Sequence, residues 1–571
     1  MQRQPVALCK VPPYYSRSSV NLNRHDAKMS DKHWQWLLYI LLLCGSIVIL
    51  VTFLDYGLTW DEEVQRNYGE LVLRWYGSLF RDRSALGYQN LNLYGAFFEV
   101  IAQLVVRLSP FGVYETRHLV TALFGVLAIA TTYRLGAFVS DPMGGFFSAL
   151  FLTLTPVFYG HQFNNSKDIP FLTLSLLAFY FILQSYDSLP RLPRRLIVKI
   201  GVSLGLTLGI RAGGIFLFGY LALLWACWLT MQWLSNRSKS QVEEVQAAQP
   251  ERPNGLSSLK TIAHLSLSFA LISLIAWVVM LVWWPWAQIK PLVNPFRALA
   301  QTAHFSTGLR VFHGGQYVPA TDLPASYLPT WFAISMPEFY FISLVAGLFL
   351  AYQFARRFAK TPGCFDRIIK IGMLIFGFCF PPTMAILMHS TLYNGLRHFL
   401  FVIPILAVLA GISFAALFKP DANRVVKAVA AALVVLSMGS TVFDMVQLHP
   451  YQYIYFNRTI AGGLKNAAER YETDYWGMSY REGVEWVIKN YRPDAQEQIR
   501  VANCSKLFLT GYFLEKAEET RQRFRSVRSD EDPHLFLAIS RCHRKRERQI
   551  VHTVERQGAP LMNVIELKQP D

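Results

Sequence analysis

The stretch WQWLLYILLLCGSIVILVTF occupies residues 34–53 and contains no charged side chain. A run of about 20 apolar residues has the length that an α-helix needs to cross the hydrocarbon core of a bilayer. A second run of this kind, FLFVIPILAVLAGISFAALF, occupies residues 399–418. Uncharged runs of this length predict membrane spans rather than helices buried in a soluble core.

The composition of the whole chain agrees with that interpretation. The chain has 571 residues, of which 53% are hydrophobic and only 16% are charged, and this is too apolar for an ordinary soluble protein. The fold class that we predict is a polytopic α-helical membrane protein. About eleven spans are expected, at residues 34–53, 118–138, 143–159, 169–186, 196–211, 214–233, 261–283, 338–355, 369–388, 398–418 and 425–445.

The charged residues predict the orientation of these spans. Residues 1–33 are polar and basic and lack the apolar core of a signal peptide, so we expect an uncleaved first span and a cytoplasmic N-terminal tail. Basic loops tend to stay in the cytoplasm. The connections that fall on that side do carry the basic residues, which are Arg191, Arg194, Arg195, Lys199, Arg237, Lys239, Lys260, Arg356, Arg357, Lys360, Arg367, Lys370, Lys419, Arg424 and Lys427.

The same placement explains the formal net charge of +17, which comes from 55 basic and 38 acidic residues. In a soluble protein this excess would suggest a nucleic-acid partner. Here the basic side chains gather between apolar runs, where they set orientation and meet anionic lipid headgroups. The sequence therefore favours membrane lipids as partners and argues against nucleic acid.

This topology divides the chain into three parts. Residues 1–33 form the cytoplasmic tail, residues 34–446 the transmembrane domain, and residues 447–571 a non-cytoplasmic C-terminal domain. Two long outer loops, at residues 54–117 and 284–338, belong to the transmembrane domain. We see no internal repeat of the kind on which many transporter folds are built.

Local patterns predict structure outside the spans. In the first outer loop, apolar residues at helical spacing over residues 62–80 and 94–108 predict two helices that lie in the membrane interface. The C-terminal domain is expected to be a small α/β fold, with strands at IRVAN (499–503), RFRSV (523–527), HLFLAIS (534–540) and NVIEL (563–567). It holds Cys504 and Cys542, and the sequence leaves open whether they form a disulfide or remain free thiols.

The run GLTWDEE places Asp61, Glu62 and Glu63 just after the first span, where a helix is expected to begin. One interpretation is structural, because an aspartate at a helix N-cap and glutamates in the first turn stabilise a helix. The other is functional: a carboxylate at the membrane surface can act as general base on an acceptor hydroxyl. Both interpretations can hold for one residue.

A second motif, HQFNNSKDIP, places His161, Asn164, Lys167 and Asp168 before another span. Taken alone, its Lys–Asp pair is typical of a solvated helix end with Pro170 in the first turn. An acidic and a basic group that face the first outer loop would also suit a phosphate leaving group and a sugar hydroxyl. The sequence does not decide between the two.

Arg211 in GIRAGG, and Arg397 and His398 in YNGLRHFLF, lie at the outer ends of apolar runs. A charge in such a position is costly unless it reaches water, a partner or an anion. Snorkelling of each side chain toward water is one explanation. A shared phosphate site is another, since the arginine guanidinium offers a fork of donors to phosphate oxygens.

Together these features resemble the GT-C superfamily of membrane glycosyltransferases. The nearest group is glycosyltransferase family 39, which contains protein O-mannosyltransferases and aminoarabinose transferases, and within it a bacterial branch. The resemblance covers most of residues 34–490 and depends on a combination of motifs, which are RHLVTALFG (117–125), NNSKDIPF (164–171), YNGLRHFLFV (393–402), HPYQYIYFNRTIAGGLKNA (449–467) and DYWGMSYREG (474–483).

The resemblance implies a GT-C fold that transfers a sugar from a polyprenyl-phosphate donor, with inversion, at the periplasmic face of the cell inner membrane. Asp61 matches the catalytic acidic position, with Glu62 beside it, and Asp168 matches an acidic residue of the family's second outer loop, which in this chain is the short loop around residues 161–168. No metal site and no obligatory divalent ion are expected, although some other GT-C enzymes use one. The expected ligands of the substrate and the lipid phosphate are Lys167, Arg117, Arg211, Arg397, His398 and His161.

Two departures from the family bear on the acceptor. Ser166 stands where a proline usually precedes the KDIP motif, and the C-terminal domain differs from the sugar-binding domain of protein mannosyltransferases. The acceptor is therefore a lipid, a polysaccharide or a protein, and the sugar and the oligomeric state are not specified. The main alternative, a transporter or flippase of lipid-linked glycans, predicts charged residues near the middle of spans, whereas here they lie mostly at the ends.

Overall fold

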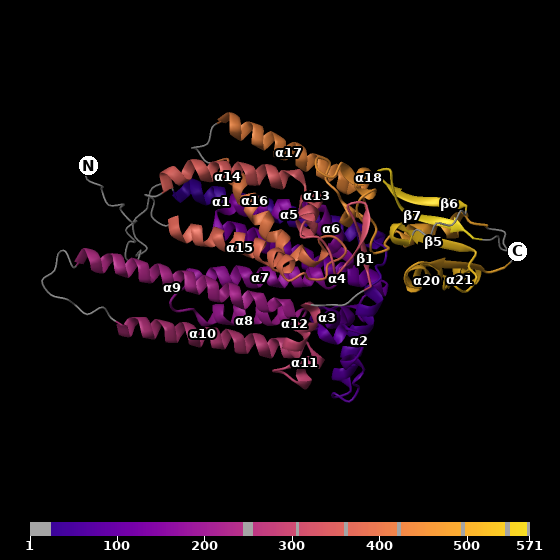
Figure 1. The fold of residues 1–571 in the computed structure, drawn as a ribbon, viewed down its shortest axis with the longest axis horizontal. Coiled ribbons are helices and arrows are strands. Elements are labelled where there is room, and N and C mark those ends of the chain that lie inside the picture. The colour runs from indigo at the N-terminus through magenta and orange to yellow at the C-terminus, as the bar shows by residue number, and fades with distance from the viewer. Residues whose placement is uncertain are drawn as a thin grey trace.

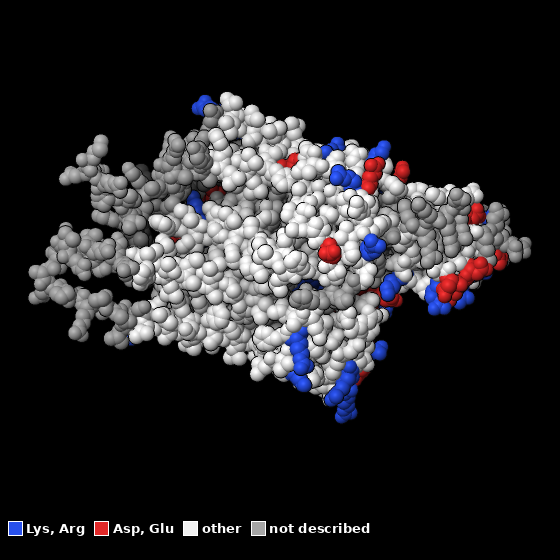
Figure 2. All heavy atoms as spheres, viewed as in Figure 1, with Lys and Arg blue, Asp and Glu red and all other residues white. Residues whose placement is uncertain are grey.

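The computed structural model describes residues 24–243, 255–303, 308–358, 364–418, 424–492, 497–542 and 549–567. Long helices run side by side in a bundle, and a small sheet lies beyond one end of it (Figure 1). On the face shown in Figure 2, a broad zone in the middle of the bundle is nearly free of Lys, Arg, Asp and Glu, and most of the charged side chains lie nearer the sheet. This distribution is the one expected of a bundle whose flanks face lipid.

The chain is a polytopic helical membrane protein, as predicted. Within the described residues, eight helices are long and apolar enough to cross a membrane, or ten if each of two bent pairs is one span. The eight spans are built from α1 (Arg24–Thr52), α4 (Val113–Val139), α7 (Asp168–Tyr186), α9 (Phe216–Glu243) preceded by η4 (Ala212–Ile215), α10 (Gly255–Val282), α15 (Cys364–Leu387), α16 (Ile403–Ala416) preceded by η5 (Arg397–Val402), and α17 (Arg424–Gln447).

The bent pairs and one short helix account for the difference from the eleven predicted spans. Helix α5 (Pro142–Thr153) meets α6 (Pro156–Asn164) at 65°, and α13 (Tyr327–Ser335) meets α14 (Glu338–Phe358) at 102°. The predicted span at residues 196–211 corresponds to α8 (Arg194–Leu208), which has 15 residues and is too short to cross a full hydrocarbon core. Helix α8 packs between α7 and α10 inside the bundle.

The two predicted interface helices are present in the first outer loop. They are α2 (Glu62–Gly77) and α3 (Phe97–Val106), and α2 runs across the direction of the spans (Figure 1). The second long outer loop lies at the same end of the bundle and contains α11 (Pro285–Ile289), α12 (Asn294–Ala303) and a hairpin of β1 (Arg310–His313) with β2 (Gln316–Pro319). These elements surround the outer ends of the spans.

The C-terminal part contains a five-stranded sheet in the order β4-β3-β5-β7-β6. Strand β3 is parallel to β4 and β5, while β7 is antiparallel to β5 and β6. Four strands coincide with the predicted ones, and β6 was not predicted because polar residues dominate it. The strands are β3 (Ile499–Asn503), β4 (Phe524–Val527), β5 (Leu535–Ile539), β6 (Ile550–Arg556) and β7 (Ala559–Glu566).

The segment between α17 and the sheet packs with the helical bundle. The segment that follows α17 buries Tyr451, Tyr453 and Trp476 in the core of the helical bundle, and the core of the sheet begins only at Tyr480. Helix α20 (Phe508–Leu514) connects the sheet to the bundle, because Tyr512 donates a hydrogen bond of 2.8 Å to Glu115 at the start of α4. The sheet is thus attached directly to the outer ends of the spans.

Cys504 and Cys542 form a disulfide, which settles the alternative that the sequence left open. The bond joins the segments that follow the parallel strands β3 and β5, and the two Cα atoms are 6.0 Å apart.

Removing this disulfide with Cys504→Ser and Cys542→Ser is expected to lower the free energy of unfolding of the sheet domain by about 2–4 kcal/mol, because the unfolded chain gains conformational entropy. Thermal unfolding of the purified protein measures this loss of stability, with Cys227→Ser of α9 as the control. An unfolding temperature of the double variant equal to that of the wild type would contradict the prediction.

Candidate active site

Charged side chains from four distant segments meet at the outer ends of the spans. Asp61 precedes α2, Asp168 begins α7, Arg211 precedes η4, and Arg397 begins η5. Arg397 bridges the two carboxylates, with its Nη2 2.8 Å from Asp61 Oδ2 and its Nε 3.0 Å from Asp168 Oδ2. Arg211 pairs with the other oxygen of Asp168. The predicted residues thus form one connected group.

Asp168 is the buried centre of this group, with a side chain only 3% exposed. Asn165 holds it at the start of α7: the Asn165 amide donates to Asp168 Oδ2 at 2.9 Å, and the Asp168 backbone N–H donates to Asn165 Oδ1 at 2.9 Å. A buried carboxylate is tolerated when it is paired and hydrogen-bonded. Asp168 therefore fixes the positions of Arg211 and Arg397.

Asp61 stands at the N-cap position of α2, but its side chain caps nothing. The capping function belongs to Glu62, whose Oε2 accepts hydrogen bonds from Thr59 N at 2.7 Å and from Thr59 Oγ1 at 3.1 Å. Thr59 and Glu62 have the spacing of a capping box. The Asp61 side chain is 40% exposed and contacts Arg397, so it is accessible to an acceptor hydroxyl.

Glu62 and Arg117 were predicted as site residues, and the structure places both in buried ion pairs. The Glu62 carboxylate is 2% exposed and lies 2.7 Å from His118 Nε2 of α4. The Arg117 guanidinium is 1% exposed and pairs with Glu99 of α3. Two adjacent residues of α4 thus bind buried carboxylates of α2 and α3. This arrangement holds the interface helices on the bundle and leaves neither Glu62 nor Arg117 open to substrate.

His161 and Asn164 of α6 also have supporting positions. His161 is fully buried, with Nε2 3.1 Å from the Tyr475 hydroxyl and Nδ1 3.2 Å from the Asn165 amide nitrogen. It therefore supports the residue that orients Asp168, and it does not line the cavity described next. Asn164 donates to Gly57 O at 3.0 Å and ties α6 to the start of the first outer loop.

A cavity of about 410 Å³ opens beside the charged group. One end is lined by the cations Lys167, Arg211 and Arg397, together with His398. The remainder is mainly apolar and is lined by side chains of α7, α9, α12 and α15 and of the segment after α15, including Phe171, Phe216, Leu299, Pro381, Met384 and Met388. Phe216, which lines this apolar part, is 42% exposed.

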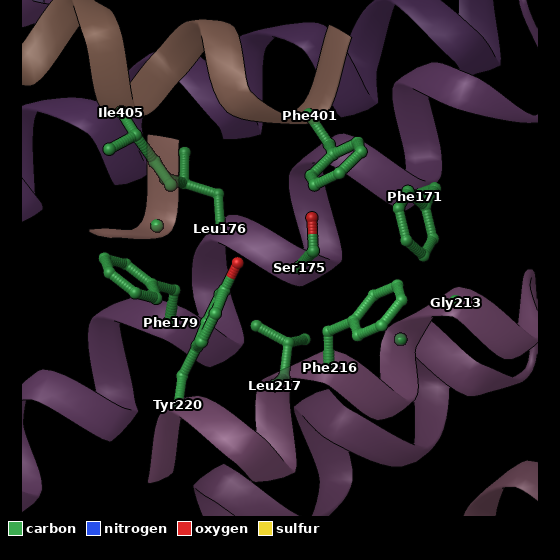
Figure 3. A pocket seen from close by; sticks show the side chains of 12 residues that line it. Phe171, Ser175, Leu176, Phe179, Gly213, Phe216, Leu217, Tyr220, Phe401 and Ile405 are labelled. Atoms are coloured by element: carbon green, nitrogen blue, oxygen red, sulfur yellow. The ribbon is translucent and has the colours of Figure 1, made fainter. Parts of the chain in front are cut away.

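A smaller apolar pocket of about 30 Å³ continues from this cavity between α7, α9, α15 and α16. The rings of Phe171, Phe216 and Phe401 line both spaces, and Phe179 and Tyr220 lie at the far end of the smaller one (Figure 3). The two pockets together lead from a cationic end into the apolar interior of the bundle. This gradient suits an amphipathic ligand with an anionic head.

Aromatic rings surround the cations of the cavity. The Lys167 ammonium lies 4.1 Å from the centroid of the Tyr94 ring, and the Arg397 guanidinium lies 4.8 Å from the Trp476 ring. Ring faces stabilise cations in partly dry sites. Burial, aided by the charge of Arg211, lowers the pKa of Lys167 to about 8. Tyr94 and Trp476 were not predicted, because single aromatic residues in outer loops carry no distinguishing pattern.

Among the described residues, no group of three or more His, Cys, Asp or Glu side chains is placed to hold a metal ion. The cations that line the cavity are side chains of the protein itself.

Comparisons with known proteins bear on this site. Residues 97–241, which include Lys167, Asp168 and Arg211, match the model of a family described as dolichyl-phosphate-mannose-protein mannosyltransferase. No curated protein sequence matches the chain.

Two solved structures of low sequence identity are similar to the chain. The oligosaccharyltransferase of Archaeoglobus fulgidus in its apo form has a TM-score of 0.46 and 13% identity, over 87% of this chain and 65% of that one. ArnT from Cupriavidus metallidurans in its apo state also has a TM-score of 0.46, with 14% identity, over 95% of this chain and 100% of that one. The chain thus spans less than two thirds of the oligosaccharyltransferase. Over residues 97–241, the family match agrees with the resemblance to the protein O-mannosyltransferase group that the sequence predicted.

Proposed function

We propose that the chain transfers a sugar from a polyprenyl-phosphate donor to an acceptor hydroxyl at the periplasmic face of the cell inner membrane. The observation that carries this proposal is the cavity whose cationic end adjoins the accessible Asp61 carboxylate and whose remainder is apolar. A polyprenyl-phosphate sugar has the matching order of groups: a sugar to react, a phosphate for the cations, and an apolar chain.

The reaction is a single displacement at the anomeric carbon. Asp61 removes the proton of the acceptor hydroxyl, and the acceptor oxygen attacks the anomeric carbon. The bond from that carbon to the phosphate oxygen breaks, and the polyprenyl phosphate leaves with the electron pair. Lys167, Arg211 and Arg397 stabilise the negative charge that develops on the phosphate, and attack from the opposite side inverts the configuration.

Charges and cysteines support the side of the membrane in this proposal. Basic residues gather in the connections assigned to the cytoplasm, which supports a cytoplasmic N-terminus and a periplasmic C-terminal sheet. The disulfide between Cys504 and Cys542 supports this assignment, because disulfides persist in oxidising compartments. A lipid-linked donor is suited to that side because its sugar can be carried across the membrane with the lipid.

Binding of lipid phosphate is expected to weaken above about pH 8, because the Lys167 ammonium of the free protein loses its proton there. A lipid monophosphate is already dianionic at this pH, since its second pKa is about 6. Its affinity for the purified protein should fall by up to about tenfold per pH unit. The arginine of Lys167→Arg keeps its charge, so we expect the affinity of this variant to change little between about pH 7.5 and 9.5. A wild-type affinity that does not depend on pH would contradict the prediction.

The proposed function can be tested in cells that lack the chain. We expect one sugar to disappear from a glycan, lipid or protein, while the matching polyprenyl-phosphate sugar accumulates on the periplasmic side. The wild-type chain should restore the sugar, and the Asp61→Asn variant should not. Accumulation of the lipid-linked sugar on the cytoplasmic side would instead indicate a flippase and overturn the proposal.

A further inference from the structure

Among the cations of the cavity, Lys167 differs from the two arginines in its partners. Arg211 and Arg397 each pair with Asp168, whereas within the described part of the chain no carboxylate is in ion-pair contact with Lys167. Its ammonium faces the Tyr94 ring and, in the amide orientation that satisfies both neighbours of Gln65, donates a hydrogen bond of 2.9 Å to the neutral Gln65 side-chain oxygen. An ammonium has three N–H donors, so two remain for phosphate oxygens.

The Gln65 side chain links this ammonium to a buried carboxylate. In the orientation that satisfies both neighbours, its amide nitrogen donates to Glu99 Oε1 at 3.2 Å and its oxygen accepts from Lys167. An ionised carboxylate only accepts hydrogen bonds and an ammonium only donates them. An amide can bridge the two, and the Glu99 carboxylate therefore determines which end of Gln65 faces Lys167.

Glu99 is itself held from two other sides. It is 4% exposed, pairs with Arg117, and accepts a hydrogen bond of 3.0 Å from Ser166 Oγ, next to Lys167 in the chain. Gln65 is 5% exposed, so this group is shielded from water, and buried hydrogen bonds to charged groups are strong. The group connects α2, α3 and α4 with the turn that carries Lys167.

We propose that Gln65, oriented by Glu99, is a positioning residue that holds the Lys167 ammonium at the phosphate end of the cavity. Gln65 does not line the cavity, and it acts on the ligand through Lys167. The ligand that it serves is the phosphate head of the donor, so the inference rests on the proposed function. It also gives the interface helices α2 and α3 a role in donor binding.

The test is the affinity of the purified full chain in detergent for a polyprenyl monophosphate, measured near pH 7.5 for five proteins. These are the wild type, Lys167→Met, Gln65→Leu, the double variant of both, and Gln103→Leu. Gln103 is a matched control, because it is also a buried amide between α2 and α3, donates to Glu70 at 3.2 Å, and does not touch Lys167. Thermal unfolding of each variant checks the fold.

We expect Gln65→Leu to weaken binding roughly tenfold and Lys167→Met by roughly 10–100-fold, because each removes a hydrogen bond to a charged group. If Gln65 acts through Lys167, the double variant binds as Lys167→Met does, since coupled residues are not additive. Gln103→Leu should stay within about twofold of the wild type. Gln65→Leu should also shift the loss of binding to lower pH, because the ammonium loses an acceptor that favours its charged form.

This inference, but not the proposed function, would be overturned if Gln65→Leu bound the lipid as the wild type does. It would also be overturned if Gln65→Leu and Lys167→Met weakened binding additively in the double variant. Equal weakening by Gln65→Leu and Gln103→Leu would also contradict it, since it would indicate a general disturbance of α2 and α3. A wild-type protein that does not bind the lipid monophosphate would instead contradict the proposed donor. The two failures are therefore distinguishable.

Discussion

Asp61→Asn is expected to lower the rate of sugar transfer by roughly 10²–10⁴-fold. The amide has the size of the carboxylate and can still accept a hydrogen bond from Arg397, but it cannot remove a proton from an acceptor hydroxyl. Initial rates of the purified protein in vesicles measure the effect. Binding of a polyprenyl monophosphate should be unchanged or tighter, because a negative charge beside the cationic end of the cavity is removed.

Asp55→Asn provides a matched control for this variant. Asp55 also lies at the outer end of α1 and is half exposed, but its carboxylate pairs with His449 at 2.9 Å and does not contact Arg397. The control is expected to keep the rate of the wild type. If Asp61→Asn kept more than about a tenth of the wild-type rate, general-base catalysis by Asp61 would be refuted.

Arg397→Met is expected to remove detectable transfer and to lower the free energy of unfolding by about 3–5 kcal/mol. The guanidinium is 6% exposed and joins Asp61 to Asp168, so its loss leaves a buried carboxylate with one partner fewer and frees Asp61 to turn away. The cationic end of the cavity also loses one of its charges. Transfer rates together with chemical denaturation separate the two effects.

Arg397→Lys tests geometry apart from charge. A single ammonium keeps the positive charge but cannot reproduce the fork of a guanidinium across two carboxylates, so a rate loss of at least about tenfold is expected with a smaller loss of stability. Arg458→Lys is the control, because Arg458 also binds an aspartate, Asp444, at the outer end of the spans but lies outside the cavity. Equal rates for Arg397→Lys and the wild type would contradict the bridging role.

Much of the site could be predicted because its residues share one sequence signal, a charge at the outer end of an apolar run. Asp61, Lys167, Asp168, Arg211 and Arg397 all carry this signal, and the structure brings them together. The signal cannot tell which charge meets a ligand and which meets a buried partner. Arg117 has the same signal, yet its side chain is buried and pairs with Glu99.

The residues that sequence analysis missed are neutral or aromatic. Gln65, Tyr94 and Trp476 act through contacts between segments far apart in the chain, and nothing in their local sequence marks them. One error was avoidable, because Thr59 and Glu62 have the spacing of a capping box. That spacing assigns the cap to Glu62, and in the structure the Asp61 side chain makes no cap hydrogen bond and contacts Arg397 instead.

The positions of the spans followed from hydropathy, whereas their lengths and bends did not. Helix α8 belongs to a long apolar region, but it ends at Leu208 and packs inside the bundle. The sequence predicted one span across α5 and α6, although Pro156 begins α6 after a bend of 65°. The sequence predicted Tyr451 and Tyr453 as part of the C-terminal domain. In the structure they are buried in the core of the helical bundle, by tertiary packing that sequence patterns do not reveal.

The most direct test of the account is to follow the lipid product. Purified wild-type protein is added to a lipid extract from cells that lack the chain, together with membranes from the same cells as a source of acceptor, and mass spectrometry follows the polyprenyl lipids. The account predicts that a polyprenyl-phosphate sugar is converted to polyprenyl monophosphate, mole for mole with sugar on the acceptor, and that Asp61→Asn leaves the donor intact. Unchanged lipid-linked sugars with the wild type, or equal conversion by both proteins, would contradict it.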